Sequence, residues 1–152
     1  MKNIFLSLGS NLGNREANLN TALEEISEFF TILNKSKIHE TEPEDYLDQA
    51  KFLNMAIEIE TELTPVELIF KLQEIEHKMG RQRTVEKGPR IIDLDIIFYD
   101  NKTVNSPNLK IPHPRAHLRN FVLIPMKEIA PNYLHPGLKQ DINTLYEKLK
   151  DN

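Results

Sequence analysis

Residues 52–80, "FLNMAIEIETELTPVELIFKLQEIEHKMG", contain a complete strand pattern followed by a complete helix pattern. From 53 to 60, apolar residues alternate with Asn, Ala or Glu, which is the period-two pattern of a strand with one buried face. A helix start follows, with Thr64 at the N-cap, Pro65 at the first helical position and Glu67 completing a capping box. The stretch therefore predicts a strand that leads directly into an amphipathic helix.

The patterns on both sides extend this unit into a regular order of elements. The helix has an apolar stripe that should be buried, formed by Leu68, Ile69, Leu72, Ile75 and Met79. Gly80 can end the helix in a left-handed conformation. Further elements are predicted as strands at 2–8, 32–40 and 91–99, and as helices at 15–30 and 142–149. This order predicts the α+β class: a ferredoxin-like βαββαβ sheet with helices on one face, plus a C-terminal extension with short strands and helices.

The composition is that of an ordinary globular protein. The chain has 152 residues, of which 39% are hydrophobic and 28% charged, and it contains no Cys. We expect one domain over residues 1–152, a monomer, in the cytoplasm, because no repeat, linker, signal peptide or membrane span is visible. The net charge of −4 argues against nucleic acid as a partner, although RNA-binding modules share this order of elements.

Two short cationic stretches stand out in this acidic chain. Residues 81–90, "RQRTVEKGPR", and residues 113–119, "HPRAHLR", are rich in Arg, Lys and His. Such clusters are typical of a site for a local anionic ligand such as a polyphosphate. Solvated loop charge is the simpler interpretation of either stretch considered alone.

The predicted strand at 91–99 carries two acids in an apolar run. Asp93 and Asp95 should project from one face, and three apolar residues should face the opposite layer: Leu94, Ile96 and Phe98. Two carboxylates at such positions need compensation, either from a hard divalent cation or from the arginines of the preceding loop. Mg²⁺ bound together with substrate phosphates would supply this compensation. Considered alone, the Asp-x-Asp pattern could instead mark a strand end that is exposed to water.

Several motifs together resemble those of the 6-hydroxymethyl-7,8-dihydropterin pyrophosphokinase family. They are "LGSNLGNR" at 8–15, "FLN" at 52–54, "IEHKMGRQR" at 75–83, "GPRIIDLDIIF" at 88–98 and "IPHPRAHLRNFVLIP" at 111–125. They occur in the order of that family, over essentially the whole chain. The resemblance implies transfer of the β,γ-diphosphate of ATP to the hydroxymethyl group of the pterin, with AMP as the other product, in tetrahydrofolate biosynthesis.

The resemblance also implies a set of site residues. The catalytic residues would be Arg81, Arg83, Arg90, Asp93 and Asp95, with two Mg²⁺ ions held by Asp93 and Asp95. ATP would meet Glu76, Arg83, Arg90, His113 and Arg119. The pterin would meet Thr41, Pro43, Phe52, Asn54, Asp93 and Phe121. Plain core packing is the alternative for the two Phe residues, and a solvated position at a helix end is the alternative for Glu76.

The chain departs from the family pattern in two loops. The segment before Gly88 is one residue short and lacks an aromatic residue, and Glu44 and Asp45 stand where a Gly commonly follows Pro43. These changes are expected to alter loop closure over the substrates. They also leave open a second interpretation, a nucleotide-binding but catalytically impaired paralogue of the same fold.

Overall fold

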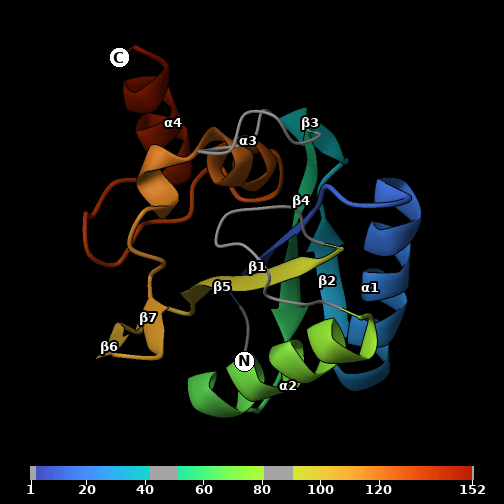
Figure 1. The fold of residues 1–152 in the computed structure, drawn as a ribbon. Helices are drawn as coiled ribbons and strands as arrows, with labels where there is room; N and C mark the ends of the chain where they lie inside the picture. The colour runs from blue at the N-terminus through green and yellow to red at the C-terminus, as the bar shows by residue number, and fades with distance from the viewer. Residues whose placement is uncertain (1–2, 42–50, 81–90, 152) are drawn as a thin grey trace.

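Five antiparallel strands form the central sheet of the molecule (Figure 1). The computed structural model describes residues 3–41, 51–80 and 91–151. The elements are β1 (Ile4–Ser10), α1 (Arg15–Phe29), β2 (Thr31–Lys35), β3 (His39–Thr41), β4 (Phe52–Glu60), α2 (Pro65–Lys78), β5 (Asp93–Tyr99), β6 (Val104–Ser106), β7 (Leu109–Ile111), η1 (Ala116–Leu118), α3 (Asn120–Ile129) and α4 (Ile142–Lys150). The strand order is β2-β4-β1-β5, with β3 paired to β4, and β6 and β7 form a separate hairpin. The predicted α+β class is confirmed.

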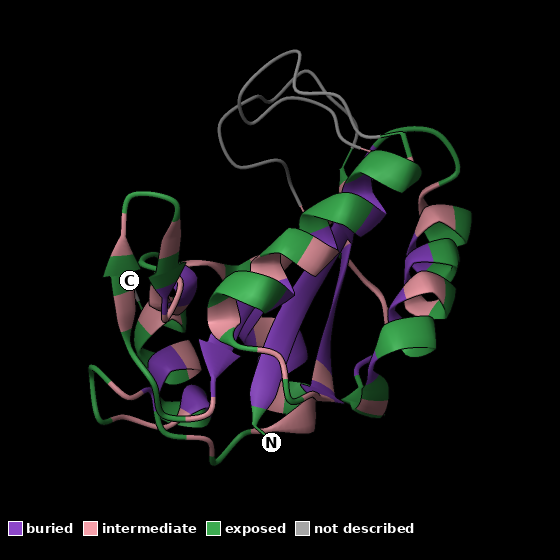
Figure 2. Cartoon of the chain, turned by 90° about the horizontal axis from the view of Figure 1, so that it is seen from below, coloured by how far each residue is buried: buried purple, intermediate pink, exposed green. Residues whose placement is uncertain are grey.

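Helices α1 and α2 cover one face of the sheet. Their buried residues, among them Leu19, Ile26, Leu68 and Leu72, pack on Leu6 and other alternate residues of the strands. Figure 2 shows the buried residues along the strands and the inner helix faces, with exposed residues on the outer surfaces of both helices. None of the helices in the described ranges is long and apolar enough to cross a membrane.

The start and stop of α2 follow the sequence prediction. The Thr64 hydroxyl accepts from the Glu67 N–H at 3.2 Å, and the Glu67 carboxylate accepts from the Thr64 N–H at 2.9 Å. Gly80 has a φ of 89°, a left-handed conformation that glycine adopts without strain. The predicted capping box and glycine stop are therefore confirmed.

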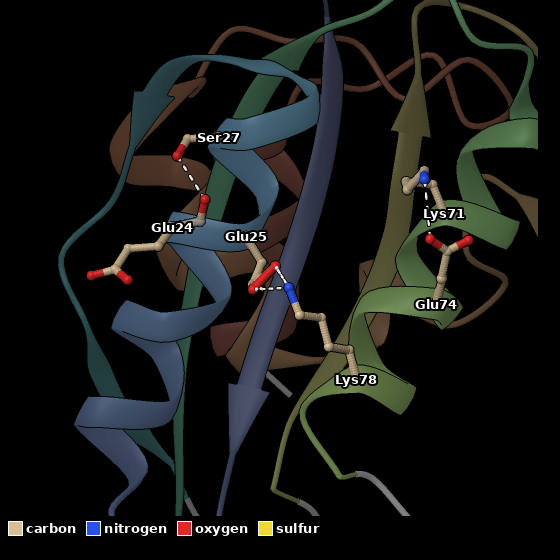
Figure 3. A network of polar contacts seen from close by, with 6 residues as sticks. All are labelled: Glu24, Glu25, Ser27, Lys71, Glu74 and Lys78. Carbon is tan, nitrogen blue, oxygen red and sulfur yellow. Dashed lines mark hydrogen bonds and ion pairs between the residues drawn. The ribbon is translucent and has the colours of Figure 1, made fainter.

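An ion pair joins α1 and α2 on the outside of this layer (Figure 3). The Lys78 ammonium donates to both oxygens of Glu25, at 2.7 and 2.9 Å. This hydrogen bond, followed by the charge of Glu25, raises the pKa of Lys78. The contact links the last turn of α2 to α1, and its contribution to stability is small because the lysine is largely exposed.

Helices α3 and α4 cover part of the opposite face. Val122, Leu123 and Met126 of α3 pack with Phe5 of β1 and with several further residues, among them Ala56, Ile97, Phe98, Ile142 and Leu145. The C-terminal extension thus supplies a second layer of helices, which lies beside the upper left part of the sheet in Figure 1.

A bulge in β5 overturns one detail of the sequence prediction. The register changes between Leu6, which pairs with Ile96, and Phe5, which pairs with Phe98, so that Ile97 is an extra residue in the strand. Consequently Ile97 and Phe98 both enter the core beneath α3 and α4. The prediction that Phe98 faces the same layer as Leu94 and Ile96 was wrong, because a bulge shifts the alternation by one residue.

The segment predicted as one strand at 32–40 is divided into β2 and β3. Ser36 still pairs with β4, since its N–H donates to the Ala56 carbonyl at 2.9 Å. The Ala56 N–H donates to the Ser36 hydroxyl at 3.0 Å, so a side-chain oxygen enters the ladder just after the end of β2. The next N–H along the chain, of Lys37, points away from β4 and donates to the Glu128 carboxylate of α3 at 2.7 Å.

His135 is a buried imidazole outside the site described below. Its Nδ1 accepts from the N–H groups of Gly137 and Leu138, at 3.1 and 3.0 Å, which requires the neutral ring. Burial, followed by the nearby His117, lowers the pKa of His135.

The lowered pKa of His135 predicts an acid-sensitive fold. Below the unfolded-state pKa of about 6.5 the unfolded chain binds more protons than the folded one, so stability should fall as the pH decreases toward and through the folded-state pKa. Urea unfolding at a series of pH values from 8 to 5 measures this slope. The His135→Asn variant, which retains an acceptor but does not titrate, should show a shallower slope, and an unchanged slope would refute the assignment.

Candidate active site

The site lies where four strand ends meet at one edge of the sheet. The last residues of β1 and β3 and the first residues of β4 and β5 lie together because these neighbouring strands are antiparallel. In register, Gly9 of β1 stands between Asn54 of β4 and Asp93 of β5, and Ser7 stands beside Asp95. Cross-strand partners share a face, so Asn54, Gly9 and Asp93 form one row and Asp95 begins the next.

Asp93 and Asp95 lie on the face opposite α1 and α2. The intervening Leu94 is buried in the core beneath those helices, whereas both aspartates are only partly buried. The two carboxylates therefore point away from the main core, as predicted.

The donor chemistry of this pair fits Mg²⁺. Both side chains supply hard oxygen ligands from alternate positions of one strand. Among the described residues no group of three or more His, Cys, Asp or Glu side chains is placed to hold a metal. A pair of carboxylates suits Mg²⁺, because this ion usually takes one or two carboxylates and completes its shell with water molecules and substrate phosphates.

Glu76 is buried rather than solvated, which overturns the alternative considered for it. Its side chain is on α2, the residue is 5% exposed, and its carboxylate accepts from the Leu94 N–H at 2.8 Å. Leu94 lies between the two aspartates, so this hydrogen bond fixes the backbone that carries them. Since β5 is the last strand in the sheet order, Glu76 also satisfies a backbone donor at the edge of the sheet.

Asn54 and Thr41 form the polar end of the row. Asn54 is 3% exposed, and its amide Nδ2 donates to the Thr41 hydroxyl at 2.5 Å. This contact fixes the orientation of the amide. The predicted Asn54 and Thr41 are thus brought together.

Gly9 is required by the close approach of its neighbours. A Cβ at this position would lie 2.8 Å from Asn54 Oδ1 and 3.5 Å from Phe52 Cδ1. Any larger residue would displace the amide, so Gly9 belongs to the site although the sequence analysis did not include it. The glycine of a strand-to-turn segment such as "LGSN" was the available signal.

The beginning of α3 brings the C-terminal motif to the same face. Phe121 lies in the first turn of α3 and is partly buried against the core beneath α3 and α4. The Arg119 guanidinium lies 5.3 Å from the centre of the Phe121 ring. His113 is fixed beside β5, since its N–H donates to the Ile97 carbonyl at 3.1 Å and its Nδ1 accepts from the Arg115 N–H at 3.3 Å.

Four predicted site residues lie outside the described residues. They are Pro43, Arg81, Arg83 and Arg90. Glu44 and Asp45 and the shortened loop before Gly88 also lie there, so their roles stay predictions.

The comparisons with known proteins point to one family. The family model "7,8-dihydro-6-hydroxymethylpterin-pyrophosphokinase (HPPK)" matches residues 5–131. The "2-amino-4-hydroxy-6-hydroxymethyldihydropteridine pyrophosphokinase" of Bacillus subtilis (strain 168) is 46% identical over 133 residues, which cover 86% of this chain and 80% of that protein.

A longer relative and a solved structure agree. The "Folic acid synthesis protein fol1" of Pneumocystis carinii is 42% identical over 97% of this chain, but the chain spans only 20% of its length. The Plasmodium falciparum HPPK-DHPS triple mutant with STZ-DHP superposes with a TM-score of 0.80 at 19% identity, covering 97% of this chain and 43% of the other. At that identity the likeness concerns the fold.

Proposed function

Because the chain belongs to the 7,8-dihydro-6-hydroxymethylpterin-pyrophosphokinase family, we propose that it transfers the β,γ-diphosphate of ATP to the hydroxymethyl oxygen of 6-hydroxymethyl-7,8-dihydropterin. The products are the pterin diphosphate and AMP, a step of tetrahydrofolate biosynthesis. The observation that carries the proposal is the row formed by Asn54, Gly9 and Asp93, with Asp95 beside it. This row supports the proposal because an amide suited to a polar heterocycle lies beside a carboxylate pair suited to a metal-bound polyphosphate.

The carboxylates of Asp93 and Asp95 would hold Mg²⁺, with two ions expected alongside ATP. When bound, Mg²⁺ supplies neutralisation of the triphosphate charge and a fixed geometry for its oxygens. The protein contributes the position of the two carboxylates, which the Glu76 hydrogen bond to Leu94 maintains. Such positioning and charge compensation are the main demands of in-line transfer to a hydroxyl group.

The pterin would lie against Phe52 and Phe121 with one edge on Asn54 and Thr41. Both aromatic residues are partly buried, so each retains surface for a flat ring, and this favours a binding role over core packing alone. The fixed Asn54 amide suits the polar edge of the heterocycle. Asp93, next to Gly9, would reach the hydroxymethyl end.

The cationic residues would bind the phosphates of ATP. We assign this role to Arg81, Arg83, Arg90, His113 and Arg119. We also propose that Glu76 acts on the nucleotide side, through the hydrogen bond that it accepts from the Leu94 N–H of β5. The packing of Arg119 on the Phe121 ring supports a link between the two substrate sites. Pro43 is assigned to the pterin side.

The test is AMP release from ATP with purified protein. Pterin-dependent AMP that disappears when Mg²⁺ is chelated and returns when it is restored would support both the reaction and its metal requirement. ATP binding without AMP release would favour the impaired paralogue, which none of the comparisons supports. We further propose that residues 1–152 act as one domain, as a monomer, in the cytoplasm where ATP is available.

A further inference from the structure

Strand β3 is a short element that carries a site residue. It has three residues, His39–Thr41, and is paired to β4. Thr41, its last residue, accepts the hydrogen bond from Asn54. Because three residues supply few backbone hydrogen bonds, the position of β3 depends on its side-chain contacts.

Those contacts hold β3 from both faces of the sheet. Glu40 pairs in register with Leu53, which packs against the main core, and its carboxylate accepts from Arg15 of α1 at 3.1 Å. His39 pairs with Asn54 on the site face, and its Nε2 lies 2.8 Å from Glu128 Oε2 of α3. The two faces of β3 are thus tied to different helices.

Glu128 makes two contacts with the chain entering β3. Its second oxygen, Oε1, accepts from the Lys37 N–H at 2.7 Å. Burial raises the pKa of Glu128, but the hydrogen bonds from Lys37 and His39 outweigh it and lower that pKa overall, so the group is ionised at neutral pH. A single carboxylate therefore fixes both the backbone before β3 and the ring of its first residue.

Helix α3 also carries the aromatic residue of the site. Phe121 lies in its first turn and Glu128 near its last, so α3 presents Phe121 to the site at one end and meets His39 of β3 near the other. Resting on the proposed function, we propose that Glu128 is a positioning residue that keeps Thr41 and Asn54 in register with Phe121 for binding of the pterin. It acts through β3 and does not touch the substrate.

Steady-state kinetics of AMP release from ATP separates this role from general stabilisation. Loss of both contacts in Glu128→Ala should raise the KM for 6-hydroxymethyl-7,8-dihydropterin about tenfold, the equivalent of one or two hydrogen bonds, with the KM for ATP and kcat within about twofold. Glu128→Gln, which keeps the acceptor for Lys37, should recover most of the pterin KM. Glu147→Ala, on α4 and paired with Lys150, is the matched control and should leave all parameters unchanged.

A second variant keeps the test informative if Glu128→Ala does not fold, and a binding measurement keeps it informative if the protein releases no AMP. His39→Phe removes the hydrogen bond between the imidazole Nε2 and Glu128 but leaves the bond from the Lys37 N–H in place. It should raise the pterin KM about threefold, since one hydrogen bond is lost. Calorimetric titration with the pterin and a non-hydrolysable ATP analogue gives affinities without turnover. A wild-type chain that binds pterin but releases no AMP would refute the proposed function, while the same order of variant affinities would still support the role of Glu128. The positioning role of Glu128 would be overturned by equal pterin affinity in wild type and Glu128→Ala, or by a parallel loss of ATP and pterin affinity in that variant.

Discussion

Replacing Asp95 by Asn should lower kcat/KM for AMP release by about three orders of magnitude. The change removes one of the two adjacent carboxylates while keeping the shape of the side chain and its place opposite Ser7. Loss of a metal ligand is worth several kcal/mol of charge stabilisation, and about 4 kcal/mol corresponds to a factor of roughly 10³. Initial rates at increasing Mg²⁺ concentration measure the effect, and the Mg²⁺ dependence should shift to higher concentrations.

Asp100→Asn is the matched control for this variant. Asp100 follows β5 directly, and its contact with Tyr133 is made by its carbonyl oxygen, which the substitution leaves in place. Its left-handed φ of 54° is also well tolerated by Asn. The control should keep wild-type activity. Full Mg²⁺-dependent turnover in Asp95→Asn would show that the carboxylate pair is not the metal site.

Gly9→Ala should reduce pterin affinity about fiftyfold and destabilise the fold. The added Cβ would lie 2.8 Å from Asn54 Oδ1, so the amide has to move from its place against Thr41. Overpacking of this kind costs about 1–3 kcal/mol of stability, and loss of two hydrogen bonds to the ligand accounts for the affinity. Calorimetric titration with the pterin, together with urea unfolding, measures both quantities.

The double variant Gly9→Ala with Asn54→Ala distinguishes the clash from other effects. Shortening Asn54 removes the atom that the new Cβ would meet, so the stability losses should be less than additive. Pterin affinity should stay low, because the amide is absent in the double variant. Additive losses of stability would show that the strain in Gly9→Ala arises elsewhere.

The parts of the fold that depend on local patterns were predictable. The capping box of Thr64 and Glu67 is read from residues three apart, and both hydrogen bonds are present. Asp93 and Asp95 share the predicted face because strand alternation is also local. Thr41 and Asn54, which the structure brings together, lie on different strands, and only the resemblance to a family predicted that both belong to one site.

The errors arose where distant residues decide local structure. The bulge at Ile97 places Phe98 beneath α3 and α4, and no pattern within 91–99 reveals it. The break between β2 and β3 contains Lys37, whose N–H meets the carboxylate of Glu128, 91 residues away. The solvated helix-end position considered as the alternative for Glu76 is also wrong, because the residue is buried and its carboxylate accepts from the Leu94 N–H of β5. Sequence patterns cannot supply such contacts, because they are set by packing between elements.

The central position of β1 has a consequence for the synthesis of the protein. Ile4 pairs with Ile59 on one side and with Tyr99 on the other, so β1 is synthesised well before both of its partners, β4 and β5. Until β5 has emerged, the apolar residues of β1 have only part of their sheet, and pairing across such long stretches of chain is slow. We therefore expect the nascent chain to acquire its sheet late, with the row that joins Asn54, Gly9 and Asp93 among the last contacts to form.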